Sequence, residues 1–493
     1  MWVFRESSFK ANLSLSSRGK CRLTQCRLPG KKRAALSRRT GCEFRHLRRR
    51  IASQLLMAVR TLGVLVLAAR VWGAEPLTLR EAVQLSLRSH PSLEALAEKV
   101  KAAEAGIGQA RAGAYPRLTY SELFQTSNNP VFAFSSILAQ RRFAESNFRI
   151  DALNNPGFVN NFQSQAGVEA ILHDFGATRA RVAAATAGRK MTEEQERLAR
   201  MELVARVART YHGVVLAEEA RKVAQSALRS AEADLARAEA LRAAGMSTDA
   251  DVLSIKVHLA QAREQEIRRK YDIEVARAAL NEALGVELGR EFALTTPLSE
   301  ARKPEERTVT RPEVRQAELA GQMAEAQRAA ARTSMYPRIV AQGMFEADRG
   351  RFVTRAGANW FLGGGLKWSL STGGAEKRQA EEAAHNAASA RARQREAAAA
   401  IELQIRQARA ALAAAGERVA VAEAAVGQAE ESLRITQNRY EAGLTTVHEL
   451  LRNESAVLES RMRRLAAIHD QRLAAVMVDF AQGTLSGDSD VLN

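Results

Sequence analysis

The residue types that usually carry out enzyme or metal chemistry are present, but they are not arranged for it. The eight histidines are scattered along the chain, with no HExxH pattern or other metal-binding spacing. The three cysteines (Cys21, Cys26, Cys42) form no CxxC pair. Neither a GxSxG elbow nor a phosphate-binding glycine loop occurs. We therefore predict that the protein is not an enzyme and has no catalytic residue, metal site or cofactor.

The polar residues whose spacing does repeat follow two glycines. Each glycine permits a reversal of the backbone between helices, and a Ser or Thr after it can cap the next helix. This chemistry is hydrogen bonding at a turn, and an ordinary helical hairpin explains it fully. The two turns consist of Gly245, Met246, Ser247 and Thr248, and of Gly443, Leu444, Thr445 and Thr446.

The segments that position these turns occur twice in the chain. Three pairs of segments match: 91–118 with 312–339, 172–181 with 370–379, and 241–253 with 439–451. The last two pairs share an offset of 198, so Gly176 to Gly245 and Gly374 to Gly443 both span 69 residues. Low-complexity helices can resemble each other by chance, but they do not preserve the spacing between glycines. We infer a duplication.

Each copy predicts a helix, a pair of strands and a long helical hairpin. The first helices are expected to start near Ser89 and Thr310 and to end before Pro116 and Pro337, because proline removes a backbone donor. The 69 residues after each pair of strands contain no proline and would measure about 100 Å as one helix. We expect a first repeat with its linker at 75–310, a second repeat at 311–482 and a tail at 483–493.

Two segments between these helices alternate between apolar and polar residues, as strands do. They are 160–172 and 359–370. Trp360 and Trp368 share one face of the second segment, roughly 26 Å apart at about 3.3 Å per residue. That separation is close to the ~25 Å apolar band of an outer-membrane barrel, which has aromatic residues at both edges. A half-buried sheet in a soluble protein explains the pattern equally well.

The positive charge is concentrated in a leader at residues 1–56. The leader contains fifteen Lys or Arg and two acids, so it carries +13 of the net charge of +18. It also contains all three cysteines. A nucleic-acid partner would rest on the leader alone, and we do not predict one.

Residues 57–74 have the pattern of a signal peptide. Arg60 precedes a short apolar run from Leu62 to Ala69, and small residues follow. We expect translation to start at Met57, with the leader 1–56 a mis-assigned start, and export of a chain without cysteine. No later stretch offers some 20 uninterrupted apolar residues. An exported chain of this kind is either soluble or a β-barrel.

These elements fit a duct that several chains build together. Each chain offers four strands, which cannot close a barrel, and open strand edges are not tolerated in lipid. Several copies must therefore pool their strands if the strands face lipid. Helices of about 100 Å are much longer than a bilayer is thick and must project into an aqueous space.

The duplicated Tyr-Pro-Arg segments, LHDFGATRAR and LSTGGAEKRQ, and the paired turns GMSTDADVL and GLTTVHELL resemble the TolC-like outer-membrane efflux proteins over residues 78–482. The resemblance implies a mainly α fold with a β-barrel part, in which a homotrimer forms a twelve-stranded outer-membrane barrel and a twelve-helix periplasmic tunnel. It also implies a passive exit duct for efflux or type I secretion. A periplasmic adaptor and an inner-membrane pump would be the partners, and outer-membrane lipid would surround the barrel.

In that family the two turns are periplasmic tips, where adaptors dock and the tunnel closes. Asp251 and Tyr440 match the acid and the tyrosine that hold the gate closed, whereas Thr445 stands where an arginine is often found. Glu449 matches the first acid of the constriction, but Arg452 occupies the position of the second. The resemblance therefore implies a constriction of mixed charge.

Two questions stay open on the sequence. A soluble periplasmic adaptor or coiled-coil scaffold is the alternative function, although adaptors carry one helical hairpin rather than two copies. The segment that contains the first strand pair is 23 residues longer than the segment that contains the second. The extra residues are expected to form an extracellular loop. Nothing in the sequence identifies the exported cargo.

Overall fold

The computed structural model describes residues 75–301, 309–353, 355–370 and 372–493. The predictions for the leader 1–56, its cysteines and the signal peptide 57–74 lie outside the described residues. In the described part of the chain, no helix is both long enough and apolar enough to cross a membrane.

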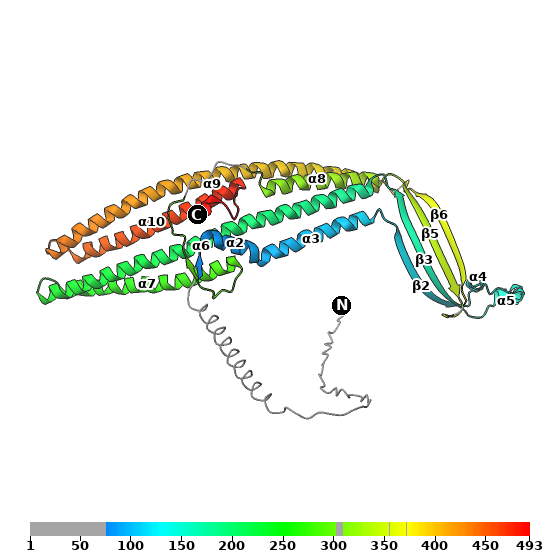
Figure 1. Ribbon diagram of the computed structural model, residues 1–493, viewed down its shortest axis with the longest axis horizontal. Coiled ribbons are helices and arrows are strands. Elements are labelled where there is room, and N and C mark those ends of the chain that lie inside the picture. Colours follow the sequence, from blue (N-terminus) through cyan, green and yellow to red (C-terminus); the bar gives the residue numbers. More distant parts are fainter. Residues whose placement is uncertain (1–74, 302–308, 354, 371) are drawn as a thin grey trace, which may run out of the picture. The chain divides into compact units, whose positions relative to one another are not determined.

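The described chain is mainly helical and carries two long helical hairpins of matching lengths (Figure 1). Helices α6 (Ala177–Ala243) and α9 (Ala375–Glu441) have 67 residues each, or about 100 Å. Helices α7 (Asp249–Leu284) and α10 (Val447–Gln482) have 36 residues each and return along them. The glycines predicted to interrupt the helices stand at these ends.

Shorter helices precede each strand pair. They are α2 (Leu79–Ser89), α3 (Pro91–Ala112) and α8 (Pro312–Thr333). Helices α3 and α8 start close to the expected positions, but their N-caps are His90 and Arg311 rather than Ser89 and Thr310. Ser89 instead ends α2, where its hydroxyl donates to the Leu85 carbonyl at 2.8 Å. His90 then accepts a hydrogen bond from the Ser92 N–H at 3.2 Å.

The two strand pairs form one four-stranded antiparallel sheet in the order β2-β3-β5-β6. The strands are β2 (Arg117–Ser127), β3 (Val159–His173), β5 (Arg338–Arg349) and β6 (Gly357–Lys367). The two hairpins meet where β3 pairs with β5. The outer edges of β2 and β6 are left without a neighbouring strand in the sheet. β6 runs from Gly357 to Lys367, so it begins two residues before and ends three residues before the strand expected over 359–370, and Trp368 lies just beyond it.

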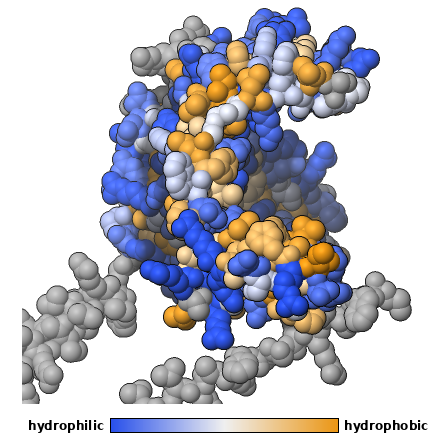
Figure 2. Space-filling view, turned by 90° about the vertical axis from the view of Figure 1, so that its right-hand side faces the viewer, coloured by the Kyte–Doolittle hydropathy of each residue, from blue (hydrophilic) through white to orange (hydrophobic). Residues whose placement is uncertain are grey.

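Strand alternation and register give this sheet one apolar and one polar face. Large exposed side chains gather on the apolar face: Leu118, Tyr120, Phe124, Val168, Phe345, Trp360, Leu362 and Leu366. Thr119, Ser121, Gln163, Gln165, Gln342, Glu346 and Asn359 lie on the other face, with Leu123, Met344 and Phe361 among them. Figure 2, which views the molecule from the sheet side, shows hydrophobic patches between hydrophilic ones.

The segment between β2 and β3 contains helical structure. Helix α4 (Pro130–Ala139), the 3₁₀ turn η1 (Glu145–Phe148) and α5 (Ile150–Asn154) lie beyond the far end of the sheet (Figure 1). Phe134, Phe143 and Phe148 pack edge to face, with ring centroids 4.9 and 5.0 Å apart. The extra residues of the first strand pair therefore include short helices and a cluster of three phenylalanines.

The largest core lies midway along α6 and joins the two repeats. Val204, Val207 and Tyr211 of α6 pack there against α2, α7 and α10. Strand β1 (Glu75–Leu77) pairs in parallel with β4 (Phe292–Leu294) beside this core. The Tyr211 hydroxyl donates to the Leu77 carbonyl at 2.8 Å and accepts from the Thr296 N–H at 3.0 Å. This core anchors both hairpins and leaves their tips to depend on local contacts.

Candidate functional site

The first tip connects α6 to α7 through a turn whose polar groups bond to one another. Gly245 has a φ of +74°, a left-handed conformation that suits glycine. Thr248 accepts from the Asp251 N–H at 3.2 Å, and the Asp251 carboxylate accepts from the Thr248 N–H at 3.1 Å. The Ser247 hydroxyl also donates to Asp251 at 3.3 Å. Hydrogen bonds from Thr248, followed by that from Ser247, hold the pKa of Asp251 below its usual value.

The second tip connects α9 to α10 and is bonded more loosely. Gly443 has a φ of +71°. Thr446 accepts from the Glu449 N–H at 3.4 Å, and the Thr445 hydroxyl donates to the Glu449 carboxylate. Arg452 is exposed one turn farther along α10. The predicted constriction residues therefore stand on the surface of one helix.

The two tips pack against each other through a small apolar cluster. Its buried members are Ala238, Val252, Ile255, Tyr440, Val447 and Leu450, which come from all four helices of the hairpins. An ion pair between Arg237 of α6 and Glu441 of α9, 3.4 Å long, borders the cluster. Met246 and Leu444, at the turns themselves, are 71% and 69% exposed. Each tip thus has a buried side that joins the hairpins and an exposed side.

The structure brings the two predicted gate residues close together and places a third residue between them. The Ser247 hydroxyl that donates to Asp251 also lies beside the Tyr440 hydroxyl. Tyr440 is only 8% exposed. Burial, and to a smaller extent the Asp251 charge, raises the pKa of the Tyr440 phenol. Asp251 and Tyr440 therefore lie close enough to interact electrostatically, while the Tyr440 hydroxyl has no hydrogen-bond partner among the described residues.

Sequence reasoning missed a set of buried polar residues about three turns inside the tips. Asp234 on α6 is 2% exposed and Glu454 on α10 is 8% exposed. His258 on α7 lies 3.2 Å from Glu454, measured from Nε2 to Oε2. These residues are set in helices rich in Ala, Glu and Arg, where a buried acid has the same sequence signature as an exposed one. A buried acid differs from an exposed one only in having another helix packed against it.

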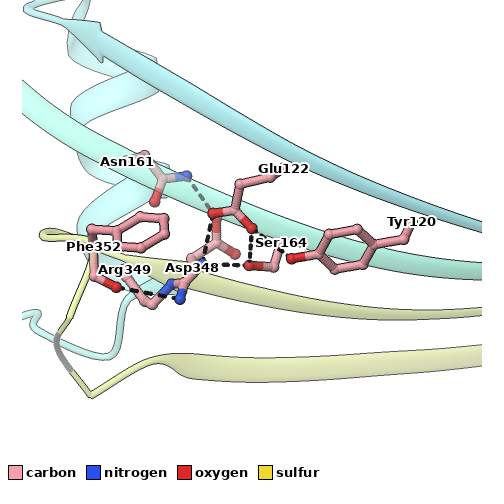
Figure 3. Close-up of polar contacts among 7 residues, drawn as sticks. All are labelled: Tyr120, Glu122, Asn161, Ser164, Asp348, Arg349 and Phe352. Carbon is pink, nitrogen blue, oxygen red and sulfur yellow. Dashed lines mark hydrogen bonds and ion pairs between the residues drawn. The ribbon is translucent and has the colours of Figure 1, made fainter. Parts of the chain in front are cut away.

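A second polar cluster holds the far end of the sheet together (Figure 3). Glu122 on β2 accepts from Arg349 on β5 at 2.6 Å and from the Tyr120 hydroxyl at 2.9 Å. On the other face, the Asn161 amide donates to Asp348 at 2.6 Å. These contacts tie β2, β3 and β5 together where the strands meet the α4 segment.

The two predicted interface tryptophans lie toward opposite ends of β6. Trp360 is 77% exposed on the apolar face, near the end that adjoins α4. Trp368 follows the other end of the strand, where its indole N–H donates to the Met335 carbonyl at 3.2 Å. In the described residues, no group of three or more His, Cys, Asp or Glu is placed to hold a metal ion.

Comparison with known proteins found a matching protein family and several solved structures with a similar fold. A family model described as outer membrane efflux protein matches residues 82–286 and 304–484. The Campylobacter jejuni CmeC outer membrane channel is similar in structure, with a TM-score of 0.71 at 17% identity, over 84% of this chain and 87% of that chain. Vibrio cholerae VceC gives a TM-score of 0.67 at 20% identity, over 82% and 96%. The open state of the Neisseria gonorrhoeae MtrE outer membrane channel gives 0.69 at 19% identity, over 83% and 90%. A comparison with curated proteins found no match.

Proposed function

The chain belongs to the outer membrane efflux protein family and acts as an exit duct, and on that premise we propose that it works as a homotrimer which crosses the outer membrane and extends into the periplasm. A soluble adaptor is not favoured. The main support for the trimer is the sheet, which has two open edges and an exposed apolar face among the described residues. The domain limits 75–310, 311–482 and 483–493 remain part of this proposal.

The open edges support a barrel shared between copies. In the order β2-β3-β5-β6 every neighbouring pair is antiparallel, so β2 and β6 at the edges run in opposite directions. The β6 of one copy can thus pair antiparallel with the β2 of the next, and the pattern continues around a ring. Three copies would supply twelve strands. Closure would satisfy backbone groups that cannot stay unpaired in lipid.

An exposed apolar stripe on α7 supports close packing between copies. Leu253, Val257, Ile267, Tyr271 and Val275 are each at least 55% exposed. Their spacing places them along one side of the helix. The other side of α7 is already buried against α6 through Val252, Ile255 and Leu259. A neighbouring copy would cover the exposed stripe and complete the wall of a tunnel.

The faces of the sheet support the placement in the membrane. We propose that the apolar face contacts outer-membrane lipid, with Trp360 and Trp368 near the two interfaces. The polar face would line the passage. The long helices would project into the periplasm, and the α4 segment would lie at the extracellular mouth.

The tips supply the proposed contact with partners. A periplasmic adaptor would dock on their exposed sides at Gly245, Met246, Ser247, Thr248, Gly443, Leu444, Thr445 and Thr446. Asp251 and Tyr440 would hold the gate closed, and Glu449 and Arg452 would border the constriction. An inner-membrane pump would supply the energy. The cargo is decided by that pump.

Fractionation of a Gram-negative host expressing the chain tests the proposal. Expression from Met1 and from Met57 should both yield detergent-extractable protein in the outer membrane if the leader is dispensable. The extracted protein should migrate as a trimer without heating and as a monomer after heating. Recovery of a monodisperse soluble periplasmic protein would refute the duct.

A further inference from the structure

The buried polar residues inside the tips connect the two hairpins directly. Asp234 belongs to α6 and His258 to α7, whereas Glu454 belongs to α10. The side chains of Asp234 and Glu454 are 2% and 6% exposed. A contact among these three residues therefore spans the first and the second hairpin in a place with little water.

The carboxyl groups of Asp234 and Glu454, both buried, lie close enough to interact with each other. Asp234 Oδ1 accepts from Arg237 Nη1 at 2.8 Å, and Glu454 Oε2 lies 3.2 Å from His258 Nε2. The remaining oxygens, Asp234 Oδ2 and Glu454 Oε1, are buried and have no donor among the described residues. Two buried acids that face each other cannot both be ionised at low cost, so one proton between them satisfies both oxygens.

Few positively charged groups lie near the two carboxyl groups. The charged or titratable groups that face it are Arg237 of α6, His258 of α7, Glu441 and Tyr440 of α9, and Arg461 of α10. Arg237 is shared between Asp234 and Glu441, at 2.8 and 3.4 Å. His258 faces Glu454. Arg461 is paired with Glu430 at 2.7 Å. Two ionised carboxylates would therefore depend on the shared Arg237 and on His258, which is charged only when it is protonated.

We propose that Asp234 and Glu454 form a proton-operated latch, in which one shared proton holds the two hairpin tips together and its loss lets them separate. A cavity of about 530 Å³ lined by His258, Glu454 and Arg461 lies beside the pair and gives solvent protons access. The apolar cluster of Tyr440, Val252 and Leu450 lies between the latch and the tips. The latch is a property of the two hairpins and does not depend on conduction.

The titration of the pair has the direction that a latch requires. Burial, followed by the facing Glu454, raises the pKa of Asp234 to about 8. Burial opposes ionisation of Glu454, but hydrogen bonds from His258 and Asp234 outweigh it and lower the pKa of Glu454. In separated hairpins an exposed Asp would titrate near 3.9. Opening therefore releases a proton between about pH 4 and pH 8, and the tip contact weakens as pH rises through that window and stays weak above it.

Double electron–electron resonance spectroscopy, which measures the distance between two spin labels, tests the latch on the full chain. Spin labels would be placed on the exposed tips through Met246→Cys and Leu444→Cys, with Cys21, Cys26 and Cys42 replaced by serine in every sample. An excess of unlabelled chain would make distances within one chain dominate. We expect the ratio of separated to joined tips to rise by up to about tenfold per pH unit between pH 5 and 8 and to level off above pH 8.

Two variants and one control test whether the Asp234–Glu454 pair causes the pH dependence of tip separation. Asp234→Asn keeps a neutral donor toward Glu454 and should abolish most of the pH dependence while the tips stay joined. Glu454→Gln removes the charge that faces Asp234 and should weaken the pH dependence of the ratio of separated to joined tips. This second variant keeps the test valid if Asp234→Asn does not fold. Glu239→Gln, an exposed acid on the same helix, should keep the slope of the unmodified chain.

The same samples separate the latch from the duct. A distance change with pH that Asp234→Asn removes supports the latch, whether or not the protein conducts. Distances that do not change between pH 5 and 9, or an unchanged slope in Asp234→Asn, overturn it. Single-channel recording then tests the duct independently, because absence of conductance at any pH would refute the proposed function and leave the latch standing.

Discussion

Replacing Tyr440 with alanine should loosen the contact between the two tips more than any change at the turns themselves. Tyr440 is 8% exposed and packs with Val252, Ile255, Val447 and Leu450 where all four long helices meet. Removal of a buried aromatic ring costs about 3–5 kcal/mol in a protein core. The tip can relax around the gap, so we expect the lower end of this range, about 3 kcal/mol.

That free energy corresponds to roughly a hundredfold increase in local opening, because about 1.4 kcal/mol is a factor of ten. Hydrogen–deuterium exchange followed by mass spectrometry should detect it in the amides near Val252 and Leu450. Met246→Ala is the matched control, since Met246 is 71% exposed and its loss should cost under about 0.5 kcal/mol. Tyr440→Phe keeps the ring and separates packing from the hydroxyl beside Ser247. Exchange in Tyr440→Ala within threefold of the Met246→Ala control would refute the assignment of the cluster as the joint between hairpins.

Three further predictions concern the constriction, the contact between copies and the caps. Arg452→Asp should increase block of single-channel current by multivalent cations, because it makes the constriction acidic; unchanged block would count against Arg452 lining it. Ile267→Glu with Tyr271→Glu should shift cross-linked trimer toward monomer, whereas Arg268→Glu, an exposed change of equal total charge, should not. Thr248→Val should destabilise its tip by about 1 kcal/mol in thermal unfolding or exchange, and Thr446→Val by less, because only Thr248 has a reciprocal bond with its acid. Equal effects of the two threonine changes would argue against that difference in capping.

The backbone breaks were predictable because glycine and proline act locally. Gly245 and Gly443 take up positive φ at the turns, and Pro116 and Pro337 precede strands β2 and β5. The helix cap at His90 was missed because Ser89 ends the preceding helix instead. The end of β6 was also misplaced, since alternation continues to Leu370 although pairing with β5 stops at Lys367. Pairing depends on the neighbouring strand, which local patterning does not report.

The buried acids could not be predicted for a related reason. Asp234 is buried because α10 packs against α6 at that level, and the order of these helices in space is absent from the pattern of either one. The proposed gate pair of Asp251 and Tyr440 rests on family resemblance alone, and nothing in the local sequence pattern predicts that these two residues lie close together. Local chemistry thus predicts where elements begin and end, whereas contacts between repeats have to be observed.

Several of the residues that join the tips stand where the two repeats differ, although Val252 and Leu450 are equivalent apolar positions. At the offset of 198, Asp234 corresponds to Ser432, Lys256 to Glu454, and His258 to Ala456. Lys256 pairs with the exposed Glu239 at 3.3 Å, while Glu454 in the matching place is buried against the other hairpin. Likewise Arg242 reaches Asp249 at the surface at 2.5 Å, while Tyr440 in the matching place points into the apolar cluster. The shared lengths of 67 and 36 residues supply a symmetric scaffold, but symmetric contacts would hold either hairpin equally well to any copy. The differences at Asp234, Glu454 and Tyr440 make the contacts of the two hairpins unequal, so the proposed latch lies at positions that the duplication did not preserve.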